Sequence, residues 1–235
     1  MTLISDSAIL VVGASGGLGR EIARLLDAGG ARLILSGRDR TKLAALGIGG
    51  TVLEADLTDP AAIAQLVADA VSVHGRLDGI VNASGVVAFG PATEVSDDTL
   101  TELFAINTLA PIRLLRAARA ALTASAEQGR EPFMLTLSGV VSESPTANLA
   151  AYSASKAGLA AFGQAAAREL RRGGIRIVDA RPGHTETALS THPIAGTAPR
   201  LPAGHPPAAV AQRLVDAIIS GERDVPSTAF QTTDA

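Results

Sequence analysis

The sequence predicts an α/β protein built on a single doubly wound parallel sheet of the Rossmann type. Short, continuously apolar segments alternate with longer helical patterns along the 235 residues, and a glycine-rich turn joins the first apolar segment to the first helix. Strands that are apolar throughout are buried on both faces, as in a parallel sheet between two layers of helices. Right-handed crossovers then predict the strand order 3-2-1-4-5-6, with ligands bound at the carboxyl ends of the strands.

The same patterns place each element along the chain. We expect strands over residues 8–12, 32–36, 51–55, 79–82, 133–138 and 175–180. Helices are expected over residues 18–28, 40–46, 60–74, 97–125, 150–171 and 208–220. Residues 224–230 would add a short seventh strand, confined to an edge of the sheet because Pro226 lacks an N–H. The whole chain, residues 1–235, is therefore interpreted as one domain.

Composition and charge exclude several classes of function. The net charge is −3, no basic block occurs, and only 3% of the residues are aromatic, which argues against nucleic acid and anionic membranes as partners. The absence of cysteine excludes disulfides and cysteine-ligated zinc, and the histidines are too scattered for a metal site. With neither a signal peptide nor an apolar segment of membrane-spanning length, the protein is expected to be soluble and cytoplasmic.

The glycine-rich turn has the form of a phosphate-binding loop. Gly13, Gly17 and Gly19 follow the spacing G-x-x-x-G-x-G between the first strand and the first helix. Glycine lets the backbone turn tightly and approach a pyrophosphate, whose charge the helix N-terminus stabilises. The candidate residues of this turn are Gly13, Ser15, Gly16, Gly17, Leu18 and Gly19.

The end of the second strand bears on the choice of nucleotide. An acidic residue there would bind the ribose 2′-hydroxyl of NAD, but this strand ends in Ser36, Gly37 and Arg38. A guanidinium matches the oxygens of a phosphate, so Arg38, with Arg40 or Ser15 as a possible second ligand, is a candidate to bind the 2′-phosphate of NADP. We therefore predict NADPH, with NAD as the second choice; the alternative is a solvated surface arginine.

Tyr152, the only tyrosine of the chain, lies four residues before Lys156 within a predicted helix. Residues four apart share one face of a helix. A nearby ammonium favours the phenolate, and we expect it to lower the phenol pKa from its ordinary value near 10. Tyr152 would then serve as general acid in carbonyl reduction and as general base in alcohol oxidation.

From Ala8 to Thr187 the sequence resembles the short-chain dehydrogenase/reductase family. The motifs GASGGLG, Asp56-Leu57, NASG, Asn107, YSASK and RPGHTET occur in the family order. The resemblance implies that Asp56 and Leu57 flank the adenine, and that Tyr152 and Lys156 lie at the nicotinamide, with Lys156 on its ribose. Further nucleotide contacts are implied for Asn82, Ala83, Ser84, Gly85, Pro182, Gly183, His184, Thr185 and Thr187. Asn107 would support a proton path behind the lysine.

The sequence departs from the family at the hydroxyl that usually orients the substrate. The family places a serine thirteen residues before the tyrosine, and that position is Gly139 here. Ser138 precedes it by one residue and Ser142 follows by three, so either hydroxyl could turn inward, or the substrate or a water could take its place. We retain Ser138 as a candidate catalytic residue with Tyr152, Lys156 and Asn107. A weak enzyme is the remaining alternative.

These observations predict an NADPH-dependent oxidoreductase of a small hydrophobic carbonyl or alcohol. The alternative is a dinucleotide-binding sensor or scaffold with little turnover, which the glycine at 139 favours. The Pro/Gly-rich segment 183–207 is expected to be a mobile substrate loop, and the pocket walls are expected from 86–91, 139–148 and this loop. By family resemblance, the helices over 97–125 and 150–171 form a homodimer face; a tetramer is possible.

Overall fold

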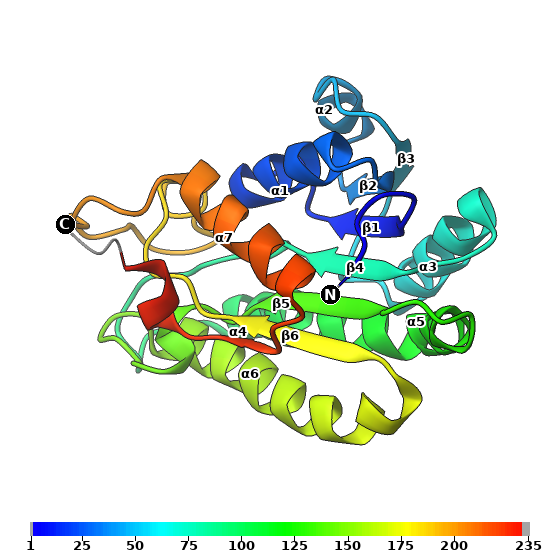
Figure 1. Cartoon of the computed structure of the whole chain (residues 1–235). Coiled ribbons are helices and arrows are strands. Elements are labelled where there is room, and N and C mark those ends of the chain that lie inside the picture. Colours follow the sequence, from blue (N-terminus) through cyan, green and yellow to red (C-terminus); the bar gives the residue numbers. More distant parts are fainter. Residues whose placement is uncertain (1, 232–235) are drawn as a thin grey trace.

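The computed structural model describes residues 2–231, and it confirms the doubly wound parallel sheet (Figure 1). The strand order is β3-β2-β1-β4-β5-β6-β7, and every neighbouring pair is parallel. The strands are β1 (Ala8–Val12), β2 (Arg32–Gly37), β3 (Thr51–Glu54), β4 (Gly79–Asn82), β5 (Phe133–Leu137), β6 (Arg176–Ala180) and β7 (Asp224–Val225). The expected seventh strand is present but only two residues long, because a 3₁₀ turn over Ser227–Phe230 follows Pro226.

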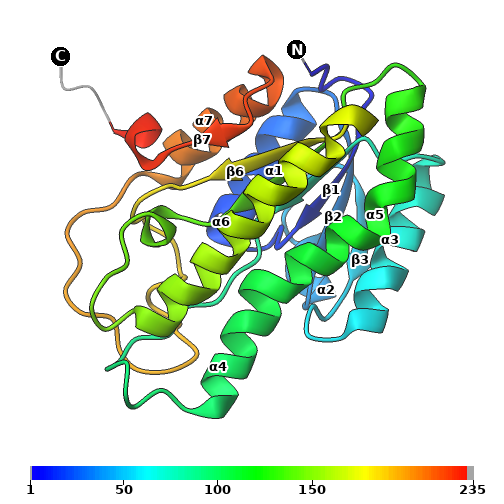
Figure 2. The same cartoon turned by 90° about the horizontal axis from the view of Figure 1, so that it is seen from below.

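Helices cover both faces of the sheet (Figures 1 and 2). One apolar core joins the sheet to α1 (Gly17–Ala28) and α7 (Pro207–Ser220). A second core joins the opposite face to α3 (Pro60–His74), α5 (Ala110–Glu127) and α6 (Ala150–Leu170). The short α2 (Arg40–Ala44) follows β2, and a 3₁₀ turn, Arg171–Gly173, closes α6. Both faces of the central strands are thus buried, which is why the middle residues of β1, β2, β4, β5 and β6 are mostly apolar.

The alternation of side chains decides which residues of β5 and β6 face α6. Leu135 and Val178 belong to the core under α1 and α7, whereas Met134 and Ile177 belong to the core under α6. Because side chains alternate along a strand, residues two positions beyond Met134 and Ile177 return to the α6 side. Asp179, two residues after Ile177, therefore projects toward the helix that carries Tyr152 and Lys156.

The helix expected over 97–125 is interrupted at its centre. The chain forms α4 (Asp97–Phe104), a π-helical turn over Ala105–Leu109, and then α5. Pro111 has no N–H to donate to the carbonyl of Asn107, so a regular α-helical ladder cannot continue through this point. The π-turn lengthens the helix by one residue at the candidate residue Asn107, as such turns often do at functional sites.

The segment between β6 and α7 contains no named helix or strand, as its Pro/Gly content predicts. Its ends are joined by a bridge between Thr185 and His205, and its tip pairs Ala195 with Ala88. Ile194 N donates to Val87 O at 2.9 Å, and Phe89 N donates to Ala195 O at 2.9 Å. The loop is therefore hydrogen-bonded across the segment that follows β4; its mobility stays a prediction.

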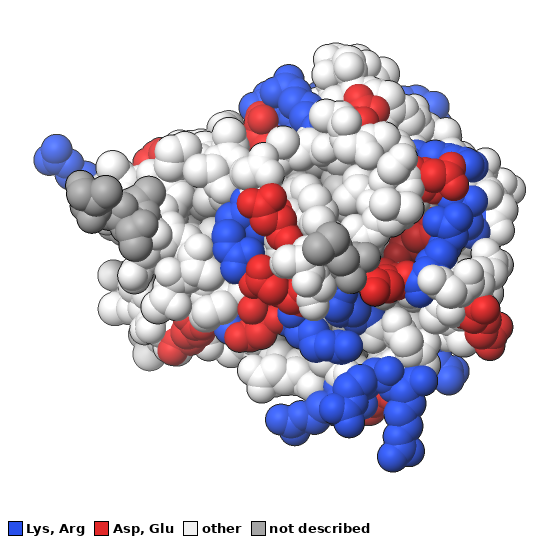
Figure 3. All heavy atoms as spheres, in the orientation of Figure 1, with Lys and Arg blue, Asp and Glu red and all other residues white. Residues whose placement is uncertain are grey.

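The face that carries α7 shows acidic and basic side chains interspersed, with basic groups along its lower edge (Figure 3).

Among residues 2–231, none of the helices combines the length and the apolarity needed to cross a membrane. The homodimer expected through α4, α5 and α6 stays a prediction.

Candidate active site

The glycine turn after β1 is packed too tightly for side chains. Gly13 has φ +78°, and a Cβ atom there would lie 2.8 Å from the backbone N of Ser84. A Cβ atom on Gly19 would overlap the carbonyl oxygen of Gly13. These two glycines let the turn rest against the chain that leaves β4 and against the start of α1. The turn is therefore fixed by the fold itself.

The N-terminus of α1 suits an anion. Its N-cap, Gly16, provides no side-chain hydrogen bond, and the first turn holds no acidic residue. The first amide N–H groups of a helix have no partner within it, and its dipole adds a partial positive charge at this end. A Cβ atom on Gly17 would lie 2.6 Å from the methyl group of Thr187, so the loop after β6 contacts the same turn. These groups fit a pyrophosphate.

The residues after β4 form the floor between this turn and α6. Asn82 accepts a hydrogen bond from the Ser84 hydroxyl (2.6 Å), and Ala83 N donates to the Val12 carbonyl (2.9 Å). Gly85 lies beside the lysine, because a Cβ atom there would lie 3.4 Å from Lys156 Nζ. The structure thus brings three sequence motifs together: the glycine turn after β1, the NASG motif after β4 and the YSASK motif on α6.

Asn107 holds this floor in position. Its amide accepts a hydrogen bond from Val86 N (3.0 Å) and donates to Val86 O (2.9 Å). The same Nδ2 also donates to the Ser155 hydroxyl at 3.0 Å. Its side chain therefore ties the segment after β4 to α6, while the expected part in a proton path stays a prediction.

Tyr152 and Lys156 share a face of α6, as their spacing predicts. Lys156 Nζ lies 5.8 Å from the centre of the Tyr152 ring. Only 5% of Lys156 is exposed, and its ammonium donates to the carbonyl of Leu137 at 2.7 Å. The ammonium is thus held at the carboxyl end of β5, beside Gly85.

The protonation of this pair differs from the sequence-based expectation. Burial raises the pKa of Tyr152 to about 12, although the neighbouring ammonium was expected to lower it. Burial also lowers the pKa of Lys156 to about 8, while the charge of Asp179 acts in the opposite direction. Desolvation disfavours both charged forms, and here it dominates. At neutral pH the phenol is therefore a neutral proton donor beside a lysine that is still mostly protonated.

The turn after β5 explains the glycine at position 139. Gly139 has φ +73° and ψ 164°, a combination that is almost restricted to glycine. Ser138 is completely buried, and its hydroxyl donates to Asp179 Oδ2 at 2.8 Å. Ser142 lies on the following 3₁₀ turn, Val140–Ser142, where its partly buried hydroxyl donates to Gly139 O at 2.7 Å and lies 3.2 Å from Ser138 Oγ. The candidate Ser138 is thus engaged with β6.

The residues expected around the adenosine lie at the ends of β2 and β3. Arg38 is exposed, and its charge contributes to the lowered pKa of Asp56, after the hydrogen bonds from Thr58. Asp56 caps its own loop by accepting from the Thr58 N–H and hydroxyl, and Leu57 is buried. A Cβ atom on Gly37 would lie 3.4 Å from Ser15 Oγ, which places Ser15 at the end of β2.

The loop residues after β6 lie near each other above that strand. The carbonyl of Pro182 accepts from Val140 N at 3.0 Å, and the Thr185 hydroxyl donates to Gly183 O at 3.1 Å. His184 lies 3.7 Å from Glu186, on the loop strand that pairs with His205. Because Thr187 packs against Gly17, this segment reaches from the end of β6 to the N-terminus of α1.

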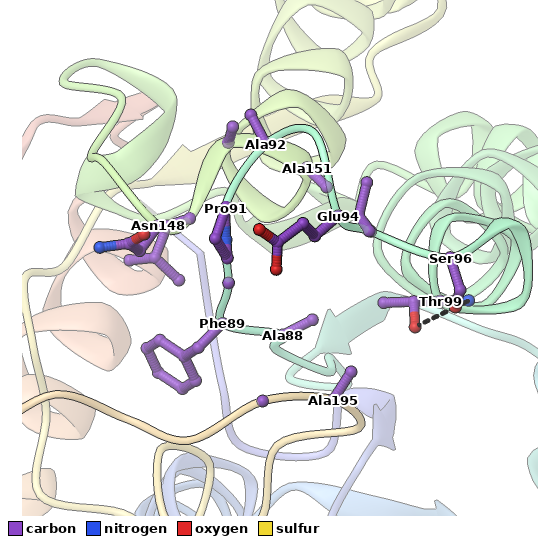
Figure 4. Close-up of a pocket in the computed structure, with 15 residues that line it drawn as sticks. Ala88, Phe89, Pro91, Ala92, Glu94, Ser96, Thr99, Asn148, Ala151 and Ala195 are labelled. Atoms are coloured by element: carbon purple, nitrogen blue, oxygen red, sulfur yellow. Dashed lines mark hydrogen bonds between the residues drawn. The ribbon is translucent and has the colours of Figure 1, made fainter.

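A cavity of 340 Å³ lies beside the N-terminus of α6 (Figure 4). The segment after β4, the chain before α6 and the loop after β6 all contribute to its wall, as expected for the substrate pocket. Ala151, next to Tyr152, lies on this wall, but neither Tyr152 nor Lys156 does. Glu94 extends its carboxylate into the cavity and is the single ionisable side chain of the wall. The sequence analysis missed Glu94, because an acid in a loop usually only marks a solvated surface.

A buried charged network was also missed. Arg181 bonds to Asp179 (2.8 Å), to Asp224 (2.8 Å) and to Glu143. Glu143 in turn accepts from the Ser227 hydroxyl at 2.5 Å. The signal was present in the sequence, since the charged residues Asp179 and Arg181 directly follow the apolar centre of a strand segment, Ile177-Val178.

A glycine turn after β1 and a tyrosine–lysine pair on α6 form the arrangement that the sequence predicts for a dinucleotide-dependent oxidoreductase, and the comparison with known proteins agrees with this class. Residues 7–195 match the model of the short chain dehydrogenase family. The chain belongs to this family and is an oxidoreductase.

Particular relatives cover most of the chain. It is 32% identical to the 3-oxoacyl-[acyl-carrier-protein] reductase FabG of Escherichia coli, over 83% of this chain and 82% of the relative. It is 29% identical to the mouse dehydrogenase/reductase SDR family member 7B, over 97% of this chain and 75% of the relative. A metagenomic short-chain oxidoreductase solved in complex with NADP is 31% identical, with a TM-score of 0.78 over 96% of this chain and 98% of that one.

Restoring the family serine at position 139 should destabilise the protein. Gly139→Ser places a side chain on a backbone conformation that costs of order 1–3 kcal/mol for residues other than glycine. The Cβ atom itself would meet only Pro182 O at 3.7 Å, so backbone strain and not a clash should cause the loss. Urea unfolding measures it. Gly173→Ser, at an open position without positive φ, is the control and should change stability by much less. Equal stability of the two variants would contradict the strain argument.

Proposed function

We propose that this protein is an NADPH-dependent reductase of small, neutral, hydrophobic ketones or aldehydes, with Tyr152 as the general acid. The observation that carries the proposal is the position of the Tyr152 ring beside the buried ammonium of Lys156, at the edge of the sheet where the glycine turn lies. Burial raises the pKa of Tyr152 to about 12, so its phenol keeps a proton that it can donate to a carbonyl oxygen during reduction.

The uncapped α1 and the floor after β4 support a nicotinamide dinucleotide as cofactor. When bound, the nicotinamide supplies the hydride. Two solved relatives above 25% identity are described in complex with this cofactor. One is the metagenomic oxidoreductase with NADP, and the other is a short-chain dehydrogenase of Sphingobium yanoikuyae with NADPH, at 26% identity and a TM-score of 0.81. Gly13, Gly16, Gly17, Leu18 and Gly19 would hold the pyrophosphate, and Ser15 with Arg38 the 2′-phosphate.

The protein's part in the reaction is to move one proton and to stabilise the charge left behind. Tyr152 Oη donates its proton to the substrate oxygen as negative charge develops there. The Lys156 ammonium, held by Leu137 O, then stabilises the phenolate. Asn107 keeps the segment after β4 in place below these groups. Lys156 could also hold ribose hydroxyls, since an ammonium has three donors and Leu137 takes one.

We assign the second hydrogen bond to the substrate to Ser142. The single proton of Ser138 is directed to Asp179, and Ser138 has no exposed surface. The Ser142 hydroxyl is partly exposed and can rotate from Gly139 O toward a bound carbonyl. This assignment would supply the hydroxyl that the glycine at 139 lacks.

The cavity beside α6 supports a neutral substrate. Its wall is mostly small and apolar, as Ala88, Pro91 and Ala195 illustrate, and Glu94 supplies the one negative charge. A carboxylate-bearing substrate would bring a second negative charge close to Glu94, which disfavours binding. The preferred substrate is therefore uncharged, or carries a hydrogen-bond donor that can reach Glu94.

Tyr152→Phe tests the proposed acid. The variant should fold and bind NADPH like the wild type but lose nearly all turnover, because phenylalanine keeps the ring and removes the proton. NADPH oxidation is followed at 340 nm with neutral carbonyls and with matched keto acids. Turnover by the variant near the wild-type rate would move the acid role elsewhere. Wild-type binding of NADPH with no turnover of any carbonyl would instead favour a sensor or scaffold.

Arg38→Ala tests the 2′-phosphate assignment. Loss of a charged phosphate ligand should raise the Michaelis constant for NADPH by about tenfold or more, and change that for NADH little. Arg119→Ala, at an exposed arginine on α5, is the control. Equal effects of Arg38→Ala on the two nucleotides would rule the assignment out.

Ser142→Ala and Ser138→Ala separate the two hydroxyls. Loss of a hydrogen bond to the developing oxyanion typically costs about 3 kcal/mol, so Ser142→Ala should lower kcat by about a hundredfold with little loss of stability. Ser138→Ala should chiefly lower stability, because it leaves the buried Asp179 without one of its donors. Steady-state kinetics and urea unfolding of both variants measure this. The reverse pattern would assign the substrate bond to Ser138.

A further inference from the structure

Asp179 is a buried carboxylate with no part in the mechanism described above. It is 4% exposed, and it lies on the side of β6 that faces α6. Its Oδ2 accepts hydrogen bonds from Ser138 and from Arg181, each at 2.8 Å. Thr136, its partner across β5, lies 3.4 Å from Oδ1. A carboxylate in such a place costs free energy unless it is well paired.

We propose that Asp179 is a positioning residue of the active site, which keeps Lys156 charged and directs the proton of Ser138 away from the substrate. The inference rests on the proposed reductase function and adds to it a fixed negative charge below the lysine. It follows from the order of contacts: Lys156 bonds to Leu137 O, the next residue is Ser138, and Ser138 bonds to Asp179.

The first effect concerns the hydroxyl groups. An ionised carboxylate accepts hydrogen bonds only, so Ser138 must donate its one proton to Asp179. Ser138 Oγ is then left as an acceptor toward Ser142, 3.2 Å away. The Ser142 hydroxyl can donate its proton to Gly139 O, to Ser138 Oγ or to a substrate. Asp179 thereby selects Ser142 as the hydroxyl available for donation.

The second effect concerns the charge of Lys156. Burial lowers the pKa of this lysine to about 8, and Asp179 is the charged group that opposes the shift. Tyr152, on α6, is neutral at this pH. Around Asp179 itself lie Arg181 just after β6, Asp224 on β7 and Glu143 after the 3₁₀ turn. Arg181 contacts all three acids.

Two charge-assisted bonds support the ionised form of Asp179. The bonds from Ser138 and Arg181 lower its pKa, although burial, the largest effect, and the charge of Asp224 raise it on balance. Arg181 is shared with Asp224 and Glu143, which are both more exposed than Asp179. The effect on Lys156 requires the ionised form of Asp179, which the close pair with Arg181 stabilises.

Asp179→Asn tests the proposal through a pH profile. In the wild type, kcat/KM for carbonyl reduction should fall above about pH 8, as Lys156 loses its proton. Without the carboxylate this fall should begin lower by roughly 1 pH unit. Asp224→Asn removes another acid bonded to Arg181 that does not touch Ser138, and it should leave the profile unchanged. A merely structural Asp179 would lower the rates at all pH values and leave the fall in place.

A measurement without substrate keeps this test separate from that of the reductase function. A lysine with a lowered folded-state pKa binds fewer protons in the folded than in the unfolded protein, so stability rises from about pH 8 up to the ordinary value of 10.5. The rise in Tm with pH should therefore begin lower in Asp179→Asn, should match the wild type in Asp224→Asn and should vanish in Lys156→Met. The double variant Asp179→Val with Arg181→Ala removes the buried pair together and should show the same early rise if Asp179→Asn does not fold.

Two outcomes would overturn the proposal: an unchanged onset of the Tm rise in a folded variant without Asp179, or an unchanged fall of its kcat/KM. If no carbonyl is reduced by the wild type but the Tm onset shifts as expected, the reductase proposal fails while the coupling of Asp179 to Lys156 stands.

Discussion

The buried ammonium of Lys156 is the group on which the rest of this site depends. Three parts of the fold meet around it: α6 supplies the side chain, the end of β5 supplies the carbonyl of Leu137, and the segment after β4 brings Gly85 to its side. Burial works against this charge and equally against ionisation of Tyr152. The result is a protonated phenol next to an ammonium that loses its proton only slightly above neutral pH, which is a suitable starting state for proton donation to a carbonyl.

The surrounding structure holds this pair by backbone contacts at least as much as by side chains. Asn107 uses its amide to fix the backbone of Val86, and the π-turn that contains it comes directly before Pro111. Gly13 has no side chain, which allows its turn to pack directly against the backbone of Ser84. Such contacts bring the glycine turn, the segment after β4 and α6 close together. No side chain caps the N-terminus of α1 through Gly16, so its first amide groups can accept an anion.

The turn after β5 shows how the conformation of one residue is linked to the side chains around it. The backbone at Gly139 adopts a conformation that strains residues other than glycine, and the hydroxyl before it is turned toward Asp179. Ser142 then lies on the adjacent 3₁₀ turn, in contact with the same group. Asp179 on β6 and Arg181 just after it are both buried and bonded to each other, so the turn after β5 and the charged network form one structural unit.

The sequence by itself determined the parallel sheet, its strand order, the glycine turn and the shared face of Tyr152 and Lys156, because these follow from local periodicity and from residues close together in the chain. It could not determine the interruption at Asn107, the direction of the Ser138 hydroxyl or the protonation of the phenol. Those depend on burial and on partners far away in the sequence, such as Asp179, which lies 41 positions beyond Ser138. Tertiary structure decided them, since desolvation and hydrogen bonding act between groups that only the folded chain brings together.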